Sequence, residues 1–136
     1  MTPAENLLAT IRQRGTDARD LRDAAHEACH ALDANVRGPW ERERIHAKLE
    51  KICGDRGTMI YYELRARTVE QLVCEDFGLA YDAEKWAGVC YMETLKTMHV
   101  ALPSVEWILG QIKAHHGRLA TRRMVDRIKG LRRRRR

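Results

Sequence analysis

Apolar residues recur three and four positions apart along most of the chain, which is the spacing of one face of an α-helix. No segment alternates apolar and polar residues as a half-buried strand would. Capping residues such as Thr16 and Ser104 precede the apolar stripes, and Gly or Pro follows them. The pattern predicts an all-α fold, a single compact domain of about six helices. The predicted helices cover residues 2–15, 16–36, 40–53, 58–77, 82–99 and 104–130.

The predicted helix over 58–77 carries a stripe that is not purely apolar. Its members lie three or four residues apart, so they share one face of the helix. Two of them are glutamates, and a carboxylate in such a position is costly to bury without a metal ion or a charged partner. The stripe consists of Met59, Glu63, Ala66, Glu70, Val73 and Phe77.

Length and charge set the domain organisation. A chain of 136 residues is long enough for one domain with a real core, and 44% hydrophobic with 32% charged residues is ordinary for a globular protein. Of the net charge of +6, five charges come from Arg132 to Arg136, so the rest of the chain is nearly neutral. We therefore expect a helical domain over 1–130 and a disordered basic tail over 131–136.

The sequence also predicts a cytoplasmic protein that does not enter a membrane. The first residues become polar at once, unlike a signal peptide, and no apolar run is long enough for a membrane span. The cysteines contain no C-x-x-C pair, so we expect reduced and mostly buried thiols. These are Cys29, Cys53, Cys74 and Cys90.

One motif suggests chemistry, the H-E-x-x-H pattern formed by His26, Glu27 and His30. On a helix, the two histidines lie four residues apart on one face and can bind a single metal ion. Cys29 points away from that face and is not expected to be a ligand. A zinc ion bound there would lower the pKa of its water to about 7, and Glu27 could act as the general base. The motif therefore predicts one zinc ion and metal-assisted hydrolysis.

A catalytic zinc ion requires a third protein ligand. Glu70 is the preferred candidate because Ala66 and Val73 flank it along the stripe. Glu63 is the alternative, either as the ligand or as an acceptor that orients a histidine. The simpler interpretation is that Glu63 pairs with Arg67 at the surface, four residues away, and that Glu70 lies on a solvated edge.

Two segments together resemble a known family. His26 to Leu32, followed by Glu63 to Leu79, is similar to the zincin-type metallopeptidase domains of bacterial and phage mobile elements, as in the ArdC-like and ImmA/IrrE-like families. The resemblance implies a zinc-dependent peptidase with a ligand glutamate on the later helix and a protein or peptide substrate. The sequence departs from the pattern, because Arg67 stands where those families place the ligand glutamate and Glu70 follows one helical turn later. It also leaves no room before the motif for the strand along which such domains align a substrate.

In the expected mechanism, zinc held by His26, His30 and Glu70 binds water, and Glu27 takes a proton from that water as it attacks a carbonyl. Candidates for stabilising the resulting oxyanion lie near the proposed ligand helix. They are Tyr61, Tyr62 and Arg67.

The basic C-terminus supports an alternative function. The tail, formed by Arg132, Arg133, Arg134, Arg135 and Arg136, continues a segment that also contains Arg118, Arg122, Arg123, Arg127 and Lys129. Such a segment can contact nucleic-acid phosphates without sequence preference. The alternative is therefore a small helical nucleic-acid-associated or protein-interaction factor whose metal site is structural or inactive. A solvated tail without a binding role is the simplest interpretation of these arginines.

Overall fold

The computed structural model of the chain describes residues 18–34 and 44–133. These residues form α-helices joined by short turns, with no strand among them, which confirms the prediction of an all-α fold in a single compact domain. Within the described ranges, no helix has the length and apolar character needed to cross a lipid bilayer. The elements are α2 (Ala18–Ala34), α3 (Arg44–Cys53), a 3₁₀ turn η2 (Gly54–Arg56), α4 (Gly57–Asp76), α5 (Ala83–Glu93), a π-helical turn η3 (Thr94–Met98), α6 (Val105–His116) and α7 (Leu119–Arg133).

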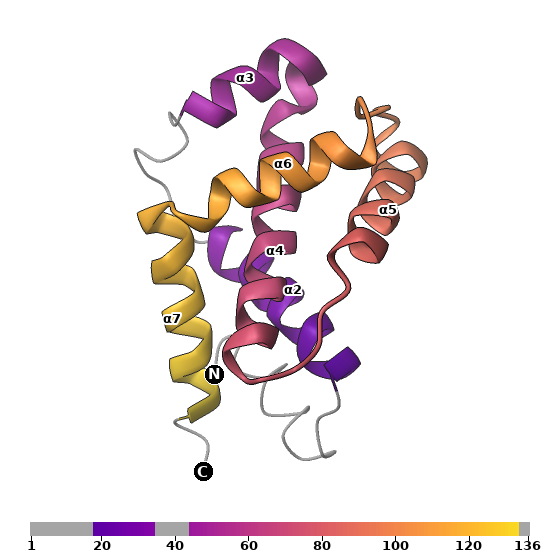
Figure 1. The fold of residues 1–136 in the computed structure, drawn as a ribbon. Helices are drawn as coiled ribbons and strands as arrows, with labels where there is room; N and C mark the ends of the chain where they lie inside the picture. The colour runs from indigo at the N-terminus through magenta and orange to yellow at the C-terminus, as the bar shows by residue number, and fades with distance from the viewer. Residues whose placement is uncertain (1–17, 35–43, 134–136) are drawn as a thin grey trace.

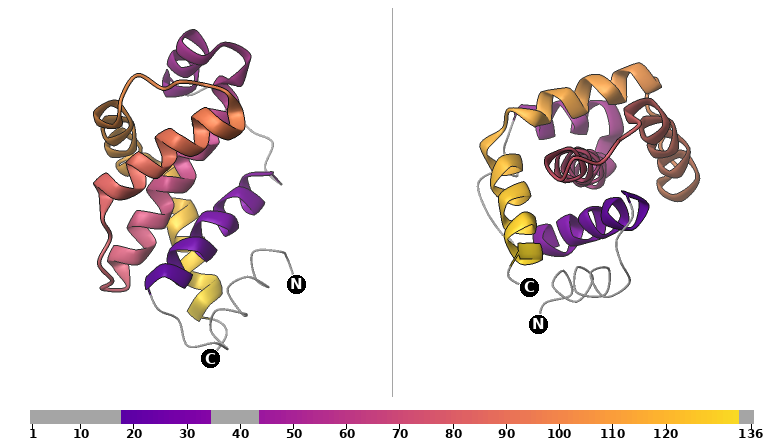
Figure 2. Two further views of the ribbon diagram at one scale, coloured as in Figure 1. Left: turned by 90° about the vertical axis from the view of Figure 1, so that its right-hand side faces the viewer. Right: turned by 60° about the horizontal axis from the view of Figure 1, so that its bottom comes forward.

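Helix α4 forms the centre of the fold. It runs through the middle of the molecule, and the view along it in Figure 2 shows α2, α5, α6 and α7 arranged around it. Helix α3 packs against its N-terminal end (Figure 1). Because α4 contacts every other α-helix of the described residues, it is buried on nearly all sides and has no single apolar face.

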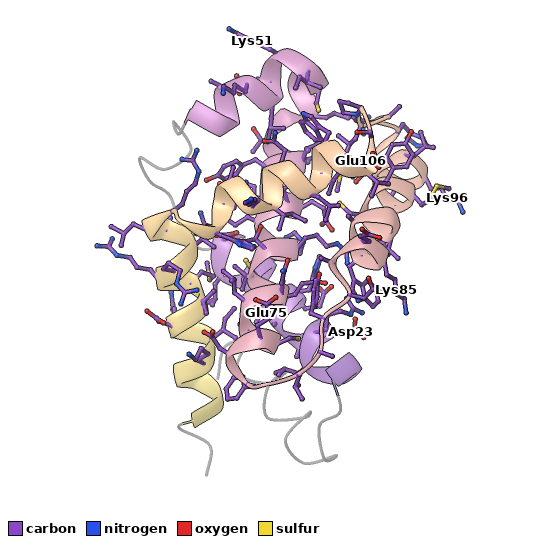
Figure 3. The ribbon with its side chains drawn as sticks, viewed as in Figure 1. Asp23, Lys51, Glu75, Lys85, Lys96 and Glu106 are labelled. Atoms are coloured by element: carbon purple, nitrogen blue, oxygen red, sulfur yellow. The ribbon has the colours of Figure 1, made fainter. Side chains whose placement is uncertain are left out.

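Two apolar clusters fill the space around α4. One joins α4 to α2 and α7 through residues such as Ala28, Val73 and Ile128. The other joins it to α3, α5 and α6 through residues such as Leu49, Leu64 and Ile108. Figure 3 shows side chains crowded around α4, whereas charged side chains such as Lys51 and Lys96 extend outward from the periphery.

Helix α4 also buries charge. Arg65 is among the largest fully buried side chains, and its Nε lies 3.4 Å from Oδ2 of buried Asp33 on α2. Its Nη2 donates to the carbonyl of Ala120 at 3.2 Å, which ties α4 to α7. Burial raises the pKa of Asp33 to about 6, and the charge of Arg65 opposes that rise. The pair thus connects three helices at a cost in desolvation that its mutual attraction offsets only in part.

The helix boundaries differ from the predicted ones at three places. The single helix expected over 104–130 is two, because α6 ends at His116 and Gly117 interrupts before α7 begins at Leu119. The segment expected over 82–99 ends in the π-helical turn η3, followed by His99 in a left-handed conformation. Helix α7 continues to Arg133, beyond the predicted domain boundary at 130. The predicted helix over 2–15 and residues 134–136 lie outside the described residues.

The predicted cap at Ser104 and the predicted free cysteines are confirmed, whereas the predicted cap at Thr16 lies outside the described residues. The side chain of Ser104 accepts a hydrogen bond from the backbone N–H of Trp107 at 3.0 Å, and Asp82 does the same for Lys85 at 3.1 Å. The cysteines are free, and Cys29, Cys74 and Cys90 are buried. Burial raises the pKa of the Cys29 thiol well above its usual range.

The close approach of α3 and α4 depends on Gly57. A Cβ atom at this position would lie 2.7 Å from both Cα and N of Glu50. These are backbone atoms, so a neighbouring side chain cannot move aside to make room. The first residue of α4 therefore has to be glycine for the two helices to pack as they do.

We predict that Gly57→Ala lowers the free energy of unfolding by about 1–3 kcal/mol, because the added methyl overpacks the contact between two helix backbones. Gly110→Ala is the matched control, since nothing lies within 4 Å of its Cβ position in the interior of α6. That variant should gain about 0.5–1 kcal/mol from helix propensity. Urea denaturation followed by circular dichroism measures both values. Equal effects for the two variants would contradict the packing argument.

His115 is a second buried polar residue of the core. It is fully buried on α6, its ring centroid lies 5.4 Å from that of Tyr61, and neither ring nitrogen has a hydrogen-bond partner among the described residues. Burial, together with the charges of Arg118, Arg65 and His116, lowers the pKa of His115 to about 3. The folded state therefore holds this imidazole neutral.

This residue should make the fold sensitive to acid. The ordinary pKa of the unfolded state lies near 6.5, so stability is complete above that pH and falls as the pH drops toward 3. We predict that His115 alone removes about 2 kcal/mol of unfolding free energy between pH 7 and pH 5. In His115→Phe, this part of the loss of unfolding free energy between pH 7 and pH 5 should be absent. The test is urea denaturation of the wild type and of His115→Phe at pH 7 and pH 5. If the difference in unfolding free energy between the two proteins is the same at both pH values, the effect is excluded.

Candidate metal centre

Helices α2 and α4 run antiparallel, and their contact brings the H-E-x-x-H motif against the glutamates of α4. The Nε2 atoms of His26 and His30 lie 3.1 Å apart. Oε2 of Glu63 lies 3.0 Å from Nε2 of His30, and Oε1 lies 3.4 Å from Nε2 of His26. The side chains of His26, His30 and Glu63 thus converge from two helices. Together they form a group that can hold a metal ion, and this set of three residues is called the metal group below.

The spacing of these atoms fits a small tetrahedral ion. Ligand atoms about 2.0–2.1 Å from a tetrahedral zinc ion lie roughly 3.3 Å from one another. The two Nε2 atoms lie 3.1 Å apart, and the two carboxylate oxygens of Glu63 lie 3.0 and 3.4 Å from them, close to this value. Two imidazole nitrogens and a carboxylate oxygen, each offering a lone pair to the same point, need a cation or a proton between them. The donor set can therefore hold a metal ion.

Glu70, the ligand preferred from the sequence, occupies a different position. Its Oε1 lies 2.5 Å from Nδ1 of His26, which is the ring nitrogen that faces away from the shared point. The hydroxyl of Tyr81 donates to Oε2 of Glu70 at 2.6 Å. The antiparallel register explains the arrangement, because Arg22, His26 and His30 of α2 successively meet α4 from Glu70 back to Glu63. The alternative residue, Glu63, is the one that the fold brings together with both histidines.

Arg67 connects the two glutamates and is itself only 3% exposed. Its Nε donates to Glu63 at 3.2 Å, its Nη1 to Glu70 at 3.4 Å, and its Nη2 to Glu93 at 2.6 Å. The pair of Glu63 and Arg67 considered from the sequence does form, but it is buried rather than at the surface. With three carboxylates around it, Arg67 links the two glutamates of α4 to Glu93 at the end of α5.

The electrostatics of the group favour a positive charge at its centre. Burial alone would lower the pKa of His26, but hydrogen bonds to Glu63 and Glu70 and the charges of those carboxylates raise it to about 9. Burial would raise the pKa of Glu63, yet its hydrogen bonds to the two histidines and the charge of Arg67 hold it well below the usual range. A buried anion that stays ionised in this way attracts either a proton or a metal ion to the shared point.

The metal group opens to solvent through a central hollow of about 220 Å³. Glu27, the catalytic residue expected from the sequence, is exposed and lines this hollow beside the histidines. The opposite wall comes from the end of α5 and from η3. The lining residues are His26, Glu27, His30, Glu63, Glu93, Thr94, Thr97 and Met98. Water and a small substrate group can therefore reach the side of the metal group on which Glu27 lies.

Two further hollows flank the central one. A polar hollow of about 120 Å³ shares His26, Glu27 and Glu93 with it, and there the guanidinium of Arg22 stacks 3.5 Å from the ring centroid of Trp86. An apolar hollow of about 300 Å³ shares His30 and Met98 with it. The three hollows thus follow one another along a cleft that crosses the metal group.

The remaining site residues proposed from the sequence are dispersed. Tyr61 is buried in the core beside His115 and lines none of the three hollows, whereas Tyr62 lines the apolar one. Arg123 and Arg127 are exposed on α7, and Arg122 and Lys129 pair with Asp76. The side chains of Arg132 to Arg136 lie outside the described residues. Nucleic-acid contact through the basic segment therefore stays a prediction.

Several residues around the metal group were missed by sequence reasoning. Arg22 lies one helical turn before His26, so its position on the motif face could have been recognised from the spacing alone. Tyr81, Trp86 and Glu93 come from the turn after α4 and from α5, and no local pattern relates them to the motif. Their place in the site follows from how α5 packs beside α4.

Comparison of the chain with protein-family models, with curated protein sequences and with solved structures finds no match. The assignment of a function therefore rests on the geometry of the metal group and its cleft.

Proposed function

We propose that this protein is a zinc-dependent hydrolase, best described as a small metallopeptidase acting on a protein or peptide substrate. The observation that carries the proposal is the convergence of two imidazole nitrogens, 3.1 Å apart, with the carboxylate of Glu63, whose two oxygens lie 3.0 and 3.4 Å from them, beside an exposed glutamate on an open hollow. In this assignment His26, His30 and Glu63 hold the ion. Glu70 accepts a hydrogen bond from the Nδ1–H of His26 and so fixes the tautomer in which Nε2 is free to bind metal.

The donor set narrows the choice of metal. Imidazole nitrogen combined with one carboxylate suits zinc, whereas magnesium and calcium prefer oxygen ligands. The same set of ligands, two histidines and one carboxylate, also binds Fe(II) in oxygenases. The exposed carboxylate of Glu27 beside the open side favours hydrolysis over oxygen chemistry, because hydrolysis needs a base at that place.

The chain's own residues account for the acid–base steps. A zinc ion held by these ligands would lower the pKa of a water molecule and polarise a carbonyl group. Glu27 accepts the proton of the attacking water and then delivers it to the leaving amine nitrogen, as its place on the rim of the hollow allows. Arg67 already pairs with three carboxylates, so its role is to position Glu63 and Glu70 rather than to contact the oxyanion.

Metal content tests the ligand assignment. We predict about one zinc ion per chain in wild-type protein purified without added metal, and loss of that zinc in His26→Ala, His30→Ala and Glu63→Ala. Glu70→Ala should keep zinc but bind it about 10–100-fold more weakly, since it removes a group that orients a ligand. Mass spectrometry of metals and competition with a chromogenic chelator measure these quantities.

Glu75→Ala is the matched control for that experiment. Glu75 lies on the same helix, is exposed, and lines none of the three hollows, and its carboxylate accepts a hydrogen bond from Gln71 at 3.0 Å. Its zinc content should equal that of the wild type. A zinc-free wild type whose stability does not change on adding zinc would exclude the metal centre. Zinc retained by Glu63→Ala and lost by Glu70→Ala would instead make Glu70 the ligand.

Catalysis is tested separately from metal binding. Glu27→Gln keeps the shape of the side chain but cannot accept a proton, so we predict normal zinc content and a 10²–10⁴-fold lower rate of peptide hydrolysis. A library of fluorogenic peptides provides the substrate, and Glu75→Gln provides the control. Hydrolysis by Glu27→Gln at the wild-type rate would remove Glu27 from the mechanism and indicate a contaminating peptidase.

A further inference from the structure

The apolar hollow differs in character from the rest of the cleft. Carbon and sulfur atoms form most of its surface, and it is the largest of the three at about 300 Å³. Met59, at the start of the α4 stripe, is 50% exposed, and an exposed methionine of this kind is a flexible apolar wall. The hollow is lined by His30, Asp33, Met59, Tyr62 and Met98.

This hollow is continuous with the metal group. His30 and Met98 line both the apolar hollow and the central one. The π-helical turn η3 forms the shared wall, and π-helical segments are frequent at functional sites. Arg56 donates from Nη1 to the carbonyl of Met98 at 2.5 Å, which ties this wall to the beginning of α4. A group seated in the hollow would therefore lie directly beside the ligand His30.

The opposite end of the cleft offers little net charge to a substrate. Arg22 pairs with Asp23 and with Glu70. Arg67 pairs with Glu63, Glu70 and Glu93. Because both cations of the polar hollow already have acidic partners, an anionic substrate group would have to displace them. Selectivity is therefore expected at the apolar end, where removing hydrocarbon from water is favourable without breaking an existing pair.

We propose that the apolar hollow is a substrate subsite that accepts an apolar side chain next to the hydrolysed bond, on the His30 side of the metal group. This inference rests on the proposed function. It assigns the specificity of the enzyme to Met59, Tyr62 and Met98, and its substrate class to peptides with a large apolar residue at that position. Since the described residues include no strand to align a peptide backbone, this side-chain contact supplies much of the alignment.

A series of alkyl hydroxamic acids tests the subsite without needing catalysis. The hydroxamate group chelates zinc, and the alkyl chain extends from it into the neighbouring hollow. We predict that affinity for the zinc-loaded protein increases about fourfold for each buried methylene, so that hexanohydroxamate binds at least tenfold more tightly than acetohydroxamate. Isothermal titration calorimetry measures the dissociation constants.

Two methionine variants make the test specific. Met59→Glu places a charge in the apolar hollow and should abolish the increase in affinity with alkyl chain length. Met92→Glu is the matched control, because Met92 is similarly exposed at 44% on α5 and lines none of the three hollows. It should behave as the wild type.

The outcomes separate the subsite from the metal centre. Two results would overturn the subsite and leave the metal centre intact. One is that acetohydroxamate binds but longer alkyl chains do not raise the affinity. The other is that Met59→Glu and Met92→Glu reduce the effect of chain length on affinity equally. No binding of any hydroxamate to protein loaded with zinc would show that the ion has no open coordination position, which would overturn the proposed hydrolase and the subsite together. An increase in affinity with chain length that Met59→Glu removes and Met92→Glu keeps supports the subsite.

Discussion

The structure depends on the pairing of charges that α4 buries at the centre of the fold. Glu63, Arg67 and Glu70 lie on a helix that is covered on nearly all sides, where an isolated charge would cost several kcal/mol. Each of these charges has a partner of opposite sign or a hydrogen-bond donor, supplied mainly by α2 and α5. The fold is therefore held in register by polar contacts as well as by apolar packing, because a shift of α2 along α4 would leave carboxylates unpaired.

The same pairing produces the metal group. Two carboxylates on one helix are needed to satisfy His26 from both sides, Glu63 at Nε2 and Glu70 at Nδ1. Arg67 and Tyr81 in turn hold these carboxylates in position. A group built in this way would be organised before any metal ion bound, since the proposed ligands and the groups that would orient them are already in contact. The structural and the proposed catalytic roles of the buried charges thus coincide.

The surroundings of the centre are asymmetric, and this asymmetry gives the cleft a direction. On the Arg22 side, stacked and paired charged groups enclose the histidine, whereas on the His30 side methionine and tyrosine form an open apolar wall. The described residues offer no strand edge to a peptide backbone, so in the proposed peptidase the chemical contrast between the two ends would take over part of that task. The π-helical turn η3 contributes to this by placing Thr97 and Met98 over the centre.

Local patterns in the sequence determined the helical class, the cap at Ser104, the motif face of His26 and His30, and the presence of two acidic residues in the α4 stripe. These features depend on residues within one or two helical turns of each other, and such spacing is visible in the chain itself. The interruption at Gly117 was not evident, because a glycine within a helical pattern is often tolerated.

Which glutamate meets both histidines was decided only by the tertiary structure. Glu63 and Glu70 share the same face of α4, and only the antiparallel register of α2 against α4 brings Glu63 to both Nε2 atoms and Glu70 to Nδ1. Likewise, Tyr81, Trp86 and Glu93 join the site because α5 packs beside α4, a long-range contact that no local spacing encodes.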